Sequence, residues 1–113
     1  MSKKYLIEFI GEYDYVAPWI GQEEPTTMGE EFEKMKELIL KSEVKDIVEF
    51  KFIDIKKDGL EETGHEDVQM LMATGKLPPI VKVNKLVATY GRYQHNIVLE
   101  MVRFLIEEEE NNN

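Results

Sequence analysis

The chain has 113 residues and a mass of 13.2 kDa, the size of one domain with one two- or three-layer core. Its 14 basic and 23 acidic residues give a net charge of −9, so we expect neither nucleic acid nor an anionic membrane as a partner. The absence of cysteine excludes disulfides, thiolate nucleophiles and thiolate metal ligands. The chain also lacks the roughly 20 apolar residues of a membrane span and shows no signal peptide, so we expect a cytoplasmic protein.

Hydrophobic periodicity predicts seven elements. Short runs rich in β-branched and aromatic residues indicate strands, and apolar residues every three or four positions indicate helices. Thr27 with Glu30, and Thr63 with Glu66, have the spacing of capping boxes at helix starts. The expected elements, in chain order, are a strand at 4–10, a helix at 27–42, a strand at 47–55, a helix at about 64–74, strands at 80–83 and 86–90, and a helix from about residue 94.

This order predicts an α/β fold with a four-stranded mixed sheet. A strand–helix–strand crossover makes the first two strands parallel neighbours, and a tight turn at Asn84-Lys85 makes the last two antiparallel. Three amphipathic helices need both faces of the sheet, so we expect an α/β/α sandwich with the first and third helices on one face. Residues 1–113 then form a single domain, with 107–113 as a disordered polar tail.

The chain resembles the thioredoxin-like fold over nearly its whole length. The resemblance rests on the strands LIEFI and VEFKFIDI, the helix that ends at Gly75 and, above all, the segment LPPIVKVNKLVATYG. In thioredoxin-like proteins a cis proline precedes the third strand and faces the start of the first helix. Pro79 is the better match for this proline and Pro78 is the alternative. The fragments YVAPWI and FIDI resemble small bacterial thioredoxin-like disulfide oxidoreductases, and the text around GRY at 91–93 resembles the arsenic-operon metallochaperone.

The sequence departs from this family at the reactive centre. Thioredoxin-fold redox proteins carry Cys-X-X-Cys between the first strand and the first helix, where the helix N-terminus lowers the pKa of the first thiol. The corresponding stretch here is Ala17-Pro18-Trp19-Ile20, and neither Ala17 nor Ile20 can exchange a disulfide. The resemblance therefore implies no thiol–disulfide oxidoreductase activity, no thiol-based arsenic binding and no cofactor.

We expect the binding surface in the groove between the loop at Ala17 to Ile20, Pro79 and Gly91, with the aromatic residues of the long stretch at 12–26 beside it. Loop aromatics give large contact area, the prolines could shape a peptide-binding edge, and the glycine with the following arginine could receive an anion. The candidate binding residues are Tyr13, Tyr15, Ala17, Pro18, Trp19, Ile20, Pro79, Gly91 and Arg92. Each of these residue types also has a purely structural interpretation. Trp19 would cover the sheet edge, the prolines would set the direction in which the chain enters the third strand, and Gly91 would permit close packing of strand against helix.

Metal and catalytic motifs are weak. His65 and His95 lack the spacing of metal ligands, and we expect both at the surface. The glutamate-rich patches at 30–37 and 107–110 lack the spacing of a calcium loop and are typical of solvated helix faces. We therefore predict no metal site.

Three functions remain open. The first is a non-catalytic thioredoxin-like binding or adaptor module for a peptide or a partner protein. The second is a non-thiol enzyme or small-ligand binder that uses the same groove, although the sequence offers no nucleophile or base with an orienting partner. The third is a homodimeric structural subunit that pairs through the edge of the second strand, where Val48, Phe50 and Phe52 would be exposed.

A thiol–disulfide exchange assay should show no turnover above the background of the reductant alone, because the chain has no sulfur nucleophile. A cysteine-bearing thioredoxin, assayed with the same disulfide substrate, provides the positive control. Turnover that depends on this protein would contradict the interpretation.

Overall fold

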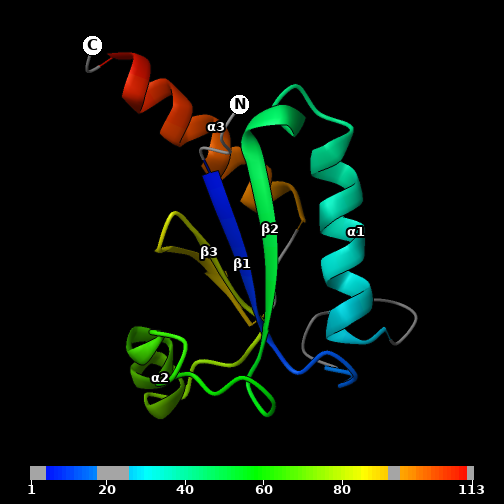
Figure 1. Cartoon of the computed structure of the whole chain (residues 1–113), viewed down its shortest axis with the longest axis vertical. Coiled ribbons are helices and arrows are strands. Elements are labelled where there is room, and N and C mark those ends of the chain that lie inside the picture. The colour runs from blue at the N-terminus through cyan, green and yellow to red at the C-terminus, as the bar shows by residue number, and fades with distance from the viewer. Residues whose placement is uncertain (1–4, 18–25, 92–94, 112–113) are drawn as a thin grey trace.

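The computed structural model describes residues 5–17, 26–91 and 95–111 (Figure 1). The elements in chain order are β1 (Tyr5–Gly11), α1 (Met28–Leu40), the 3₁₀ helix η2 (Lys45–Ile47), β2 (Val48–Asp54), α2 (Glu66–Ala73), β3 (Ile80–Val83), β4 (Leu86–Tyr90) and α3 (His95–Asn111). The predicted α/β class, with four strands in a mixed sheet and three α-helices, is confirmed. The short helix η2 was not predicted.

The strands form one sheet in the order β2-β1-β3-β4. β1 pairs in parallel with β2 and antiparallel with β3, and β3 pairs antiparallel with β4. The hairpin turn has φ of 49° at Asn84 and 71° at Lys85, the positive values that a type I′ turn requires. Asn84 also ties the hairpin to β1, since its Oδ1 accepts a hydrogen bond from the Leu6 N–H at 2.8 Å. β2 and β4 are left as the two outer strands.

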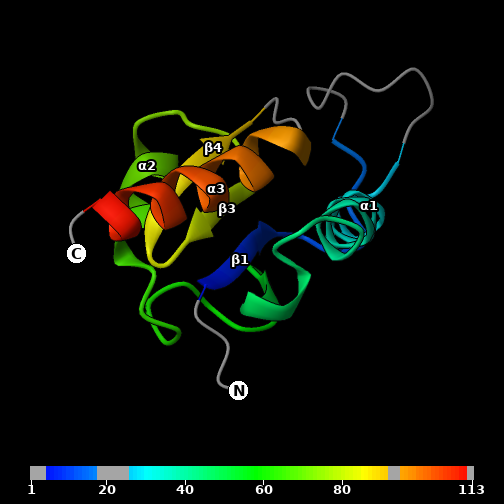
Figure 2. The same ribbon diagram turned by 90° about the horizontal axis from the view of Figure 1, so that it is seen from above.

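Alternate side chains of the sheet supply two separate cores. Ile7 and Phe9 of β1 point to one face, where they pack with α1 and α3. Ile10 points to the opposite face and packs with Val68 of α2. The first and third helices therefore share a face, as predicted, and Figure 2 shows α1 and α2 on opposite sides of the sheet. Within the described ranges, no helix is long and apolar enough to cross a membrane.

The two predicted capping boxes have different outcomes. At α1, Thr27 Oγ1 accepts from the Glu30 N–H and Glu30 Oε1 accepts from the Thr27 N–H, each at 3.1 Å. The prediction for α2 is wrong, because the Thr63 hydroxyl donates to the Gly59 carbonyl at 2.6 Å instead. That bond closes the turn before the helix, and α2 begins later, with His65 as an N-cap residue that makes no side-chain capping bond.

The end of the chain also differs from expectation. Of the tail predicted at 107–113, residues 107–111 continue α3 instead, and 112–113 lie outside the described residues. The Tyr5 hydroxyl donates to Glu109 Oε2 at 2.7 Å, which joins the start of β1 to the last turns of this helix. Burial and this hydrogen bond raise the pKa of Tyr5 to about 12. The contact between distant segments stabilises turns that local sequence would leave frayed.

Candidate functional site

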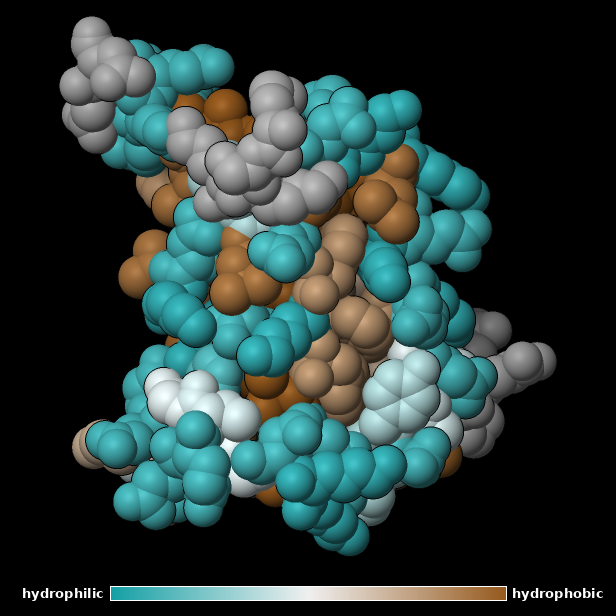
Figure 3. Space-filling model, in the orientation of Figure 1, coloured by the Kyte–Doolittle hydropathy of each residue, from teal (hydrophilic) through white to brown (hydrophobic). Residues whose placement is uncertain are grey.

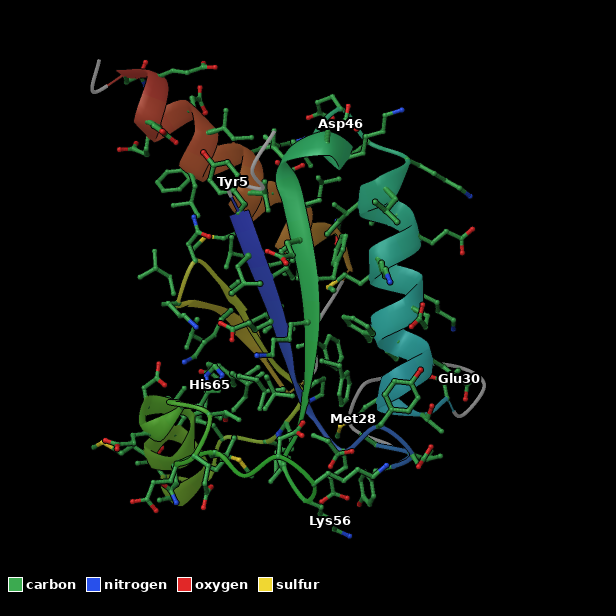
Figure 4. All side chains as sticks on the ribbon, viewed as in Figure 1. Tyr5, Met28, Glu30, Asp46, Lys56 and His65 are labelled. Atoms are coloured by element: carbon green, nitrogen blue, oxygen red, sulfur yellow. The ribbon has the colours of Figure 1, made fainter. Side chains whose placement is uncertain are left out.

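The candidate site is a pocket of about 300 Å³ where β1 and β2 end. The carboxyl ends of parallel strands are a common place for ligands in α/β proteins. Figure 4 shows Met28, in the first turn of α1, and Lys56, which follows β2, at this same end of the molecule. The lining residues are Glu12, Tyr13, Asp14, Tyr15, Asp54, Lys56 and Lys57.

Backbone hydrogen bonds fix the turn that carries both tyrosines. The Tyr15 N–H donates to the Glu12 carbonyl at 3.0 Å and closes the turn. The carbonyls of Tyr13 and Tyr15 accept from the N–H groups of Gly29 at 2.8 Å and Met28 at 2.9 Å. The turn is thus attached to the start of α1, and the two tyrosine side chains remain 37% and 43% exposed at the pocket.

The same bonds occupy the N-terminus of α1. Met28 and Gly29 donate to the turn, Glu30 donates to Thr27 Oγ1, and the Glu31 N–H donates to the Thr27 carbonyl at 3.1 Å. A helix N-terminus binds an anion, or stabilises a thiolate, through N–H groups that lack a partner. These four N–H groups all have partners, so this helix start holds the tyrosine turn and offers no anion site.

The Tyr13 ring is the outermost ring of an aromatic cluster. Its centroid lies 5.0 Å from that of Phe52 in an edge-to-face arrangement, and Phe52 stacks on Phe9 with centroids 5.5 Å apart. The ring also lies against Gly29, where an added Cβ would come within 2.5 Å of ring carbon Cε1. The ring is therefore held in place before any partner binds, which lowers the entropy cost of binding.

Asp54 organises the other wall of the pocket. Its carboxylate accepts from the N–H groups of Tyr13 at 3.2 Å, Lys56 at 3.0 Å and Lys57 at 3.2 Å. Burial raises the pKa of Asp54, but the backbone N–H groups outweigh burial and bring the pKa below its ordinary value. A carboxylate engaged in this way holds loops together and is a poor general base.

The remaining charges of the pocket have both signs. The exposed Lys56 places its Nζ 3.6 Å from Oε2 of the half-buried Glu12, and Asp14 and Lys57 are exposed. Over the described part of the chain, no group of three or more His, Asp or Glu side chains could hold a metal ion. The lining thus combines two partly exposed tyrosines with charged groups of both signs.

A second hollow, of about 400 Å³, lies between α3 and the segment that leads into β2. Arg103 on its wall donates to both carboxylate oxygens of Glu43, at 2.8 and 2.9 Å, and to Glu100 at 2.5 Å. The bond from Arg103 lowers the pKa of Glu43 to about 2. Because this guanidinium is already engaged in joining two elements, we place the candidate site at the strand ends.

The expected binding residues lie in different surroundings. Tyr13 and Tyr15 line the pocket, whereas the Ala17 side chain is buried in the core between the sheet and helices α1 and α3. Pro79 and Gly91 are brought together, since the Gly91 N–H donates to the Pro79 carbonyl at 3.1 Å. The Pro78–Pro79 peptide bond is cis. Four of the expected residues lie outside the described residues: Pro18, Trp19, Ile20 and Arg92.

A buried polar cluster between α2 and the sheet was not predicted. His65, expected at the surface, is only 1% exposed, because the segment before α2 directs it toward β1 and β3 (Figure 4). Lys82 Nζ lies 3.0 Å from His65 Nδ1 and 2.6 Å from Asp67 Oδ1, and His65 Nε2 lies 3.1 Å from Glu8 Oε2. The sequence feature that could have predicted this cluster is an ionisable residue in the middle of each of two apolar strands, Glu8 and Lys82. The register places these two residues opposite each other.

The cluster fixes the tautomer of His65. A lysine ammonium can only donate, so Nδ1 is the acceptor and the proton of the neutral ring is on Nε2, beside Glu8. The Nε2 contact does not have hydrogen-bond geometry and is electrostatic in character. Burial, followed by the positive charge of Lys82, lowers the pKa of His65 below its ordinary value, although Glu8 opposes the shift. The ring is therefore neutral at pH 7.

Comparisons with known proteins add a fold relationship. No protein-family model matches the chain, and no curated protein matches it. Among solved structures, the chain is similar to a protein of unknown function, SA0789, from Staphylococcus aureus. The TM-score is 0.69 at 14% sequence identity, and the match covers 89% of this chain and 90% of that chain. At this identity the likeness shows a shared fold alone.

The free energy of unfolding should depend on pH through His65. Its folded pKa lies below the unfolded value, near 6.5, so the unfolded chain takes up the proton first as the pH falls. Stability should therefore decrease below about pH 6.5, with a slope of at most about 1.4 kcal/mol per pH unit from this group. Urea unfolding of the wild type and His65→Gln across this range measures the difference, and identical pH profiles would contradict the assignment.

Gly29→Ala should displace the Tyr13 ring, because the new methyl group overlaps the ring. We expect a loss of roughly 1–3 kcal/mol in the free energy of unfolding, as for overpacking elsewhere. In a Tyr13→Ala background the overlap disappears, and the same substitution should stabilise the helix by about 0.5–1 kcal/mol. A double-mutant cycle from urea unfolding tests this reversal, and additive effects would show that the ring does not lie against position 29.

Proposed function

We propose that the protein is a non-catalytic binding module with a thioredoxin-like fold, and that the pocket of Tyr13 and Tyr15 holds a peptide segment of a partner. The fold proposal is supported by the element order, by the sheet order β2-β1-β3-β4 and by the place of Pro79 directly before β3. The likeness to the staphylococcal structure is compatible with this proposal but, being to a protein of unknown function, adds nothing about activity.

The observation that carries the functional proposal is the fixed presentation of the two tyrosines. Their backbone is bonded to the start of α1, and the Tyr13 ring is held between Phe52 and Gly29. Tyrosine supplies a large amphipathic surface with few rotatable bonds, which is why it is frequent in binding hot spots. A surface assembled before binding retains more of the interaction energy as affinity.

Two of the groups that could make this pocket catalytic are already engaged. The carboxylate of Asp54 accepts three backbone hydrogen bonds, and the N–H groups of the first turn of α1 are all paired. A nucleophile or base needs a lone pair or proton directed at the substrate and a partner that orients it. Recognition, rather than bond making, is the use that the lining supports best.

The size of the pocket favours a peptide over a whole small molecule. Its volume of about 300 Å³ is at the lower limit of small-ligand sites. One or two side chains of a longer chain would fill it, while the flanking residues of that chain contact the exposed side chains of Asp14 and Lys57. The acidic and basic groups of the rim are also suited to a partner that carries both charges.

Selection of peptides from a display library on the full chain, followed by NMR titration, tests the proposal. Selected peptides should shift backbone resonances at Glu12–Tyr15 and Asp54–Lys57. Tyr15→Ala should weaken binding at least about tenfold, as at a hot-spot aromatic. Phe104→Ala removes an exposed aromatic side chain of α3 that does not line the pocket, and it should bind as the wild type does.

Two results would count against the proposal. Peptides that bind but shift resonances elsewhere would move the site. If the wild type and the Tyr15→Ala variant bind the peptides with equal affinity, the Tyr15 side chain does not take part in recognition.

A further inference from the structure

The outer edge of β2 is open. β2 pairs with β1 on one side, and within residues 5–17, 26–91 and 95–111 no strand pairs with its other side. In Figure 1 β2 lies in front of β1, and no ribbon crosses in front of it. The strand has seven residues, VEFKFID, without proline or a bulge, so it is a template on which another strand can pair.

The backbone groups that face outward can be identified from the ladder. The Ile55 N–H donates to the Gly11 carbonyl of β1, so alternation directs the backbone groups of Glu49, Lys51 and Ile53 to β1 as well. The even-numbered residues therefore direct their N–H and C=O groups away from the sheet. Asp54 confirms this parity, because its N–H donates to Asp58 Oδ2 at 2.8 Å outside the ladder. Val48 is buried, so among the described residues the outward groups left for pairing are those of Phe50 and Phe52.

The side chains of β2 divide between the two faces in the same way. Val48, Phe50 and Phe52 point to the core that α1 and α3 cover, and the two phenylalanines are only half-buried. Glu49 and Lys51 are exposed on the opposite face. Figure 3 shows apolar surface along the path that β2 takes in Figure 1, with hydrophilic surface on both sides. Covering this apolar edge with another protein surface is favourable, because it removes apolar area from water.

We propose that β2 pairs antiparallel with β2 of a second copy of the chain, about a two-fold axis at Phe50. Phe50 then lies opposite the partner's Phe50, and the outward N–H and C=O groups of the two residues bond to each other. Glu49 lies opposite the partner's Lys51, and Lys51 lies opposite the partner's Glu49. The two sheets become one continuous sheet, and the interface is closed by its own symmetry.

The charges select this register. An axis at Glu49 or Lys51 would place two identical charges opposite each other, which is unfavourable. An axis at Val48 or Phe52 would leave Glu49 and Lys51 without each other as partners. With the axis at Phe50, both pairs of opposite charge form, at non-hydrogen-bonded positions where cross-strand side chains approach most closely. The edge of β2 is thus complementary in charge to a second copy of itself, which favours a second copy of the chain over an unrelated peptide as the partner.

Sedimentation equilibrium of the full chain over a range of concentrations tests the dimer. The wild type should approach twice 13.2 kDa as its concentration rises. Glu49→Lys reverses one partner in each of the two charge pairs and should raise the dimer dissociation constant at least about tenfold. Glu33→Lys makes the same charge change on an exposed position of α1 and should dimerise as the wild type does.

A charge-swapped mixture tests the register itself. Lys51→Glu should also weaken the dimer, but an equimolar mixture of Glu49→Lys and Lys51→Glu chains should form a heterodimer, because every facing pair is again opposite in charge. Circular dichroism verifies the fold of each variant. Glu49→Lys is the more informative single change, since Glu49 lies opposite Leu6 in β1, whereas Lys51 lies opposite Glu8.

The proposal does not depend on the peptide-binding role. A wild type that stays monomeric at every concentration would overturn it. A dimer that Glu49→Lys leaves unchanged, or a mixture that stays monomeric, would show that copies of the chain do not meet through β2 in this register.

Discussion

The central strand β1 is buried on both faces. The rest of the structure has to cover its apolar side chains and compensate its one buried charge. Its apolar residues direct Ile7 and Phe9 to one core and Ile10 to the other. Glu8 lies among them, and a buried carboxylate is costly unless charged or hydrogen-bonding groups compensate it. Lys85 Nζ, 3.1 Å from Glu8 Oε1, provides this compensation, and the neutral ring of His65 lies beside the other carboxylate oxygen. Lys82 of β3 contacts both His65, just before α2, and Asp67 in its first turn, and these contacts attach α2 to the sheet.

The same strand positions the candidate site. β1 ends at Gly11, and the turn that follows returns at once to the start of α1, where its carbonyls meet the first N–H groups of the helix. Asp54, at the end of the parallel neighbour β2, bonds to the same turn from the other side. The two tyrosines belong to a loop, but hydrogen bonds to α1 and to Asp54 hold the backbone of that loop from two sides.

Local signals predicted the elements well, and contacts between distant residues explain two of the errors, at His65 and at residues 107–111. The capping box of Thr27 and the turn at Asn84 depend on neighbours in sequence, and both are present. The environment of His65 and the helical form of residues 107–111 depend on groups from other elements, such as Glu8 and Tyr5. The exposed tyrosines of the pocket were predicted from loop composition. Its opposite wall was missed, because Asp54 and the residues after it are also typical of an ordinary turn.

Gly29 links the packing of the site to the sequences that the fold can accept. Glycine in a helix is less favourable than alanine by roughly 0.5–1 kcal/mol, so Gly29 lowers the intrinsic stability of α1. The ring of Tyr13 occupies the space that a methyl group would require. Positions 13 and 29 are therefore bound to vary together during evolution: a homologue with a side chain at position 29 should lack a large ring at position 13.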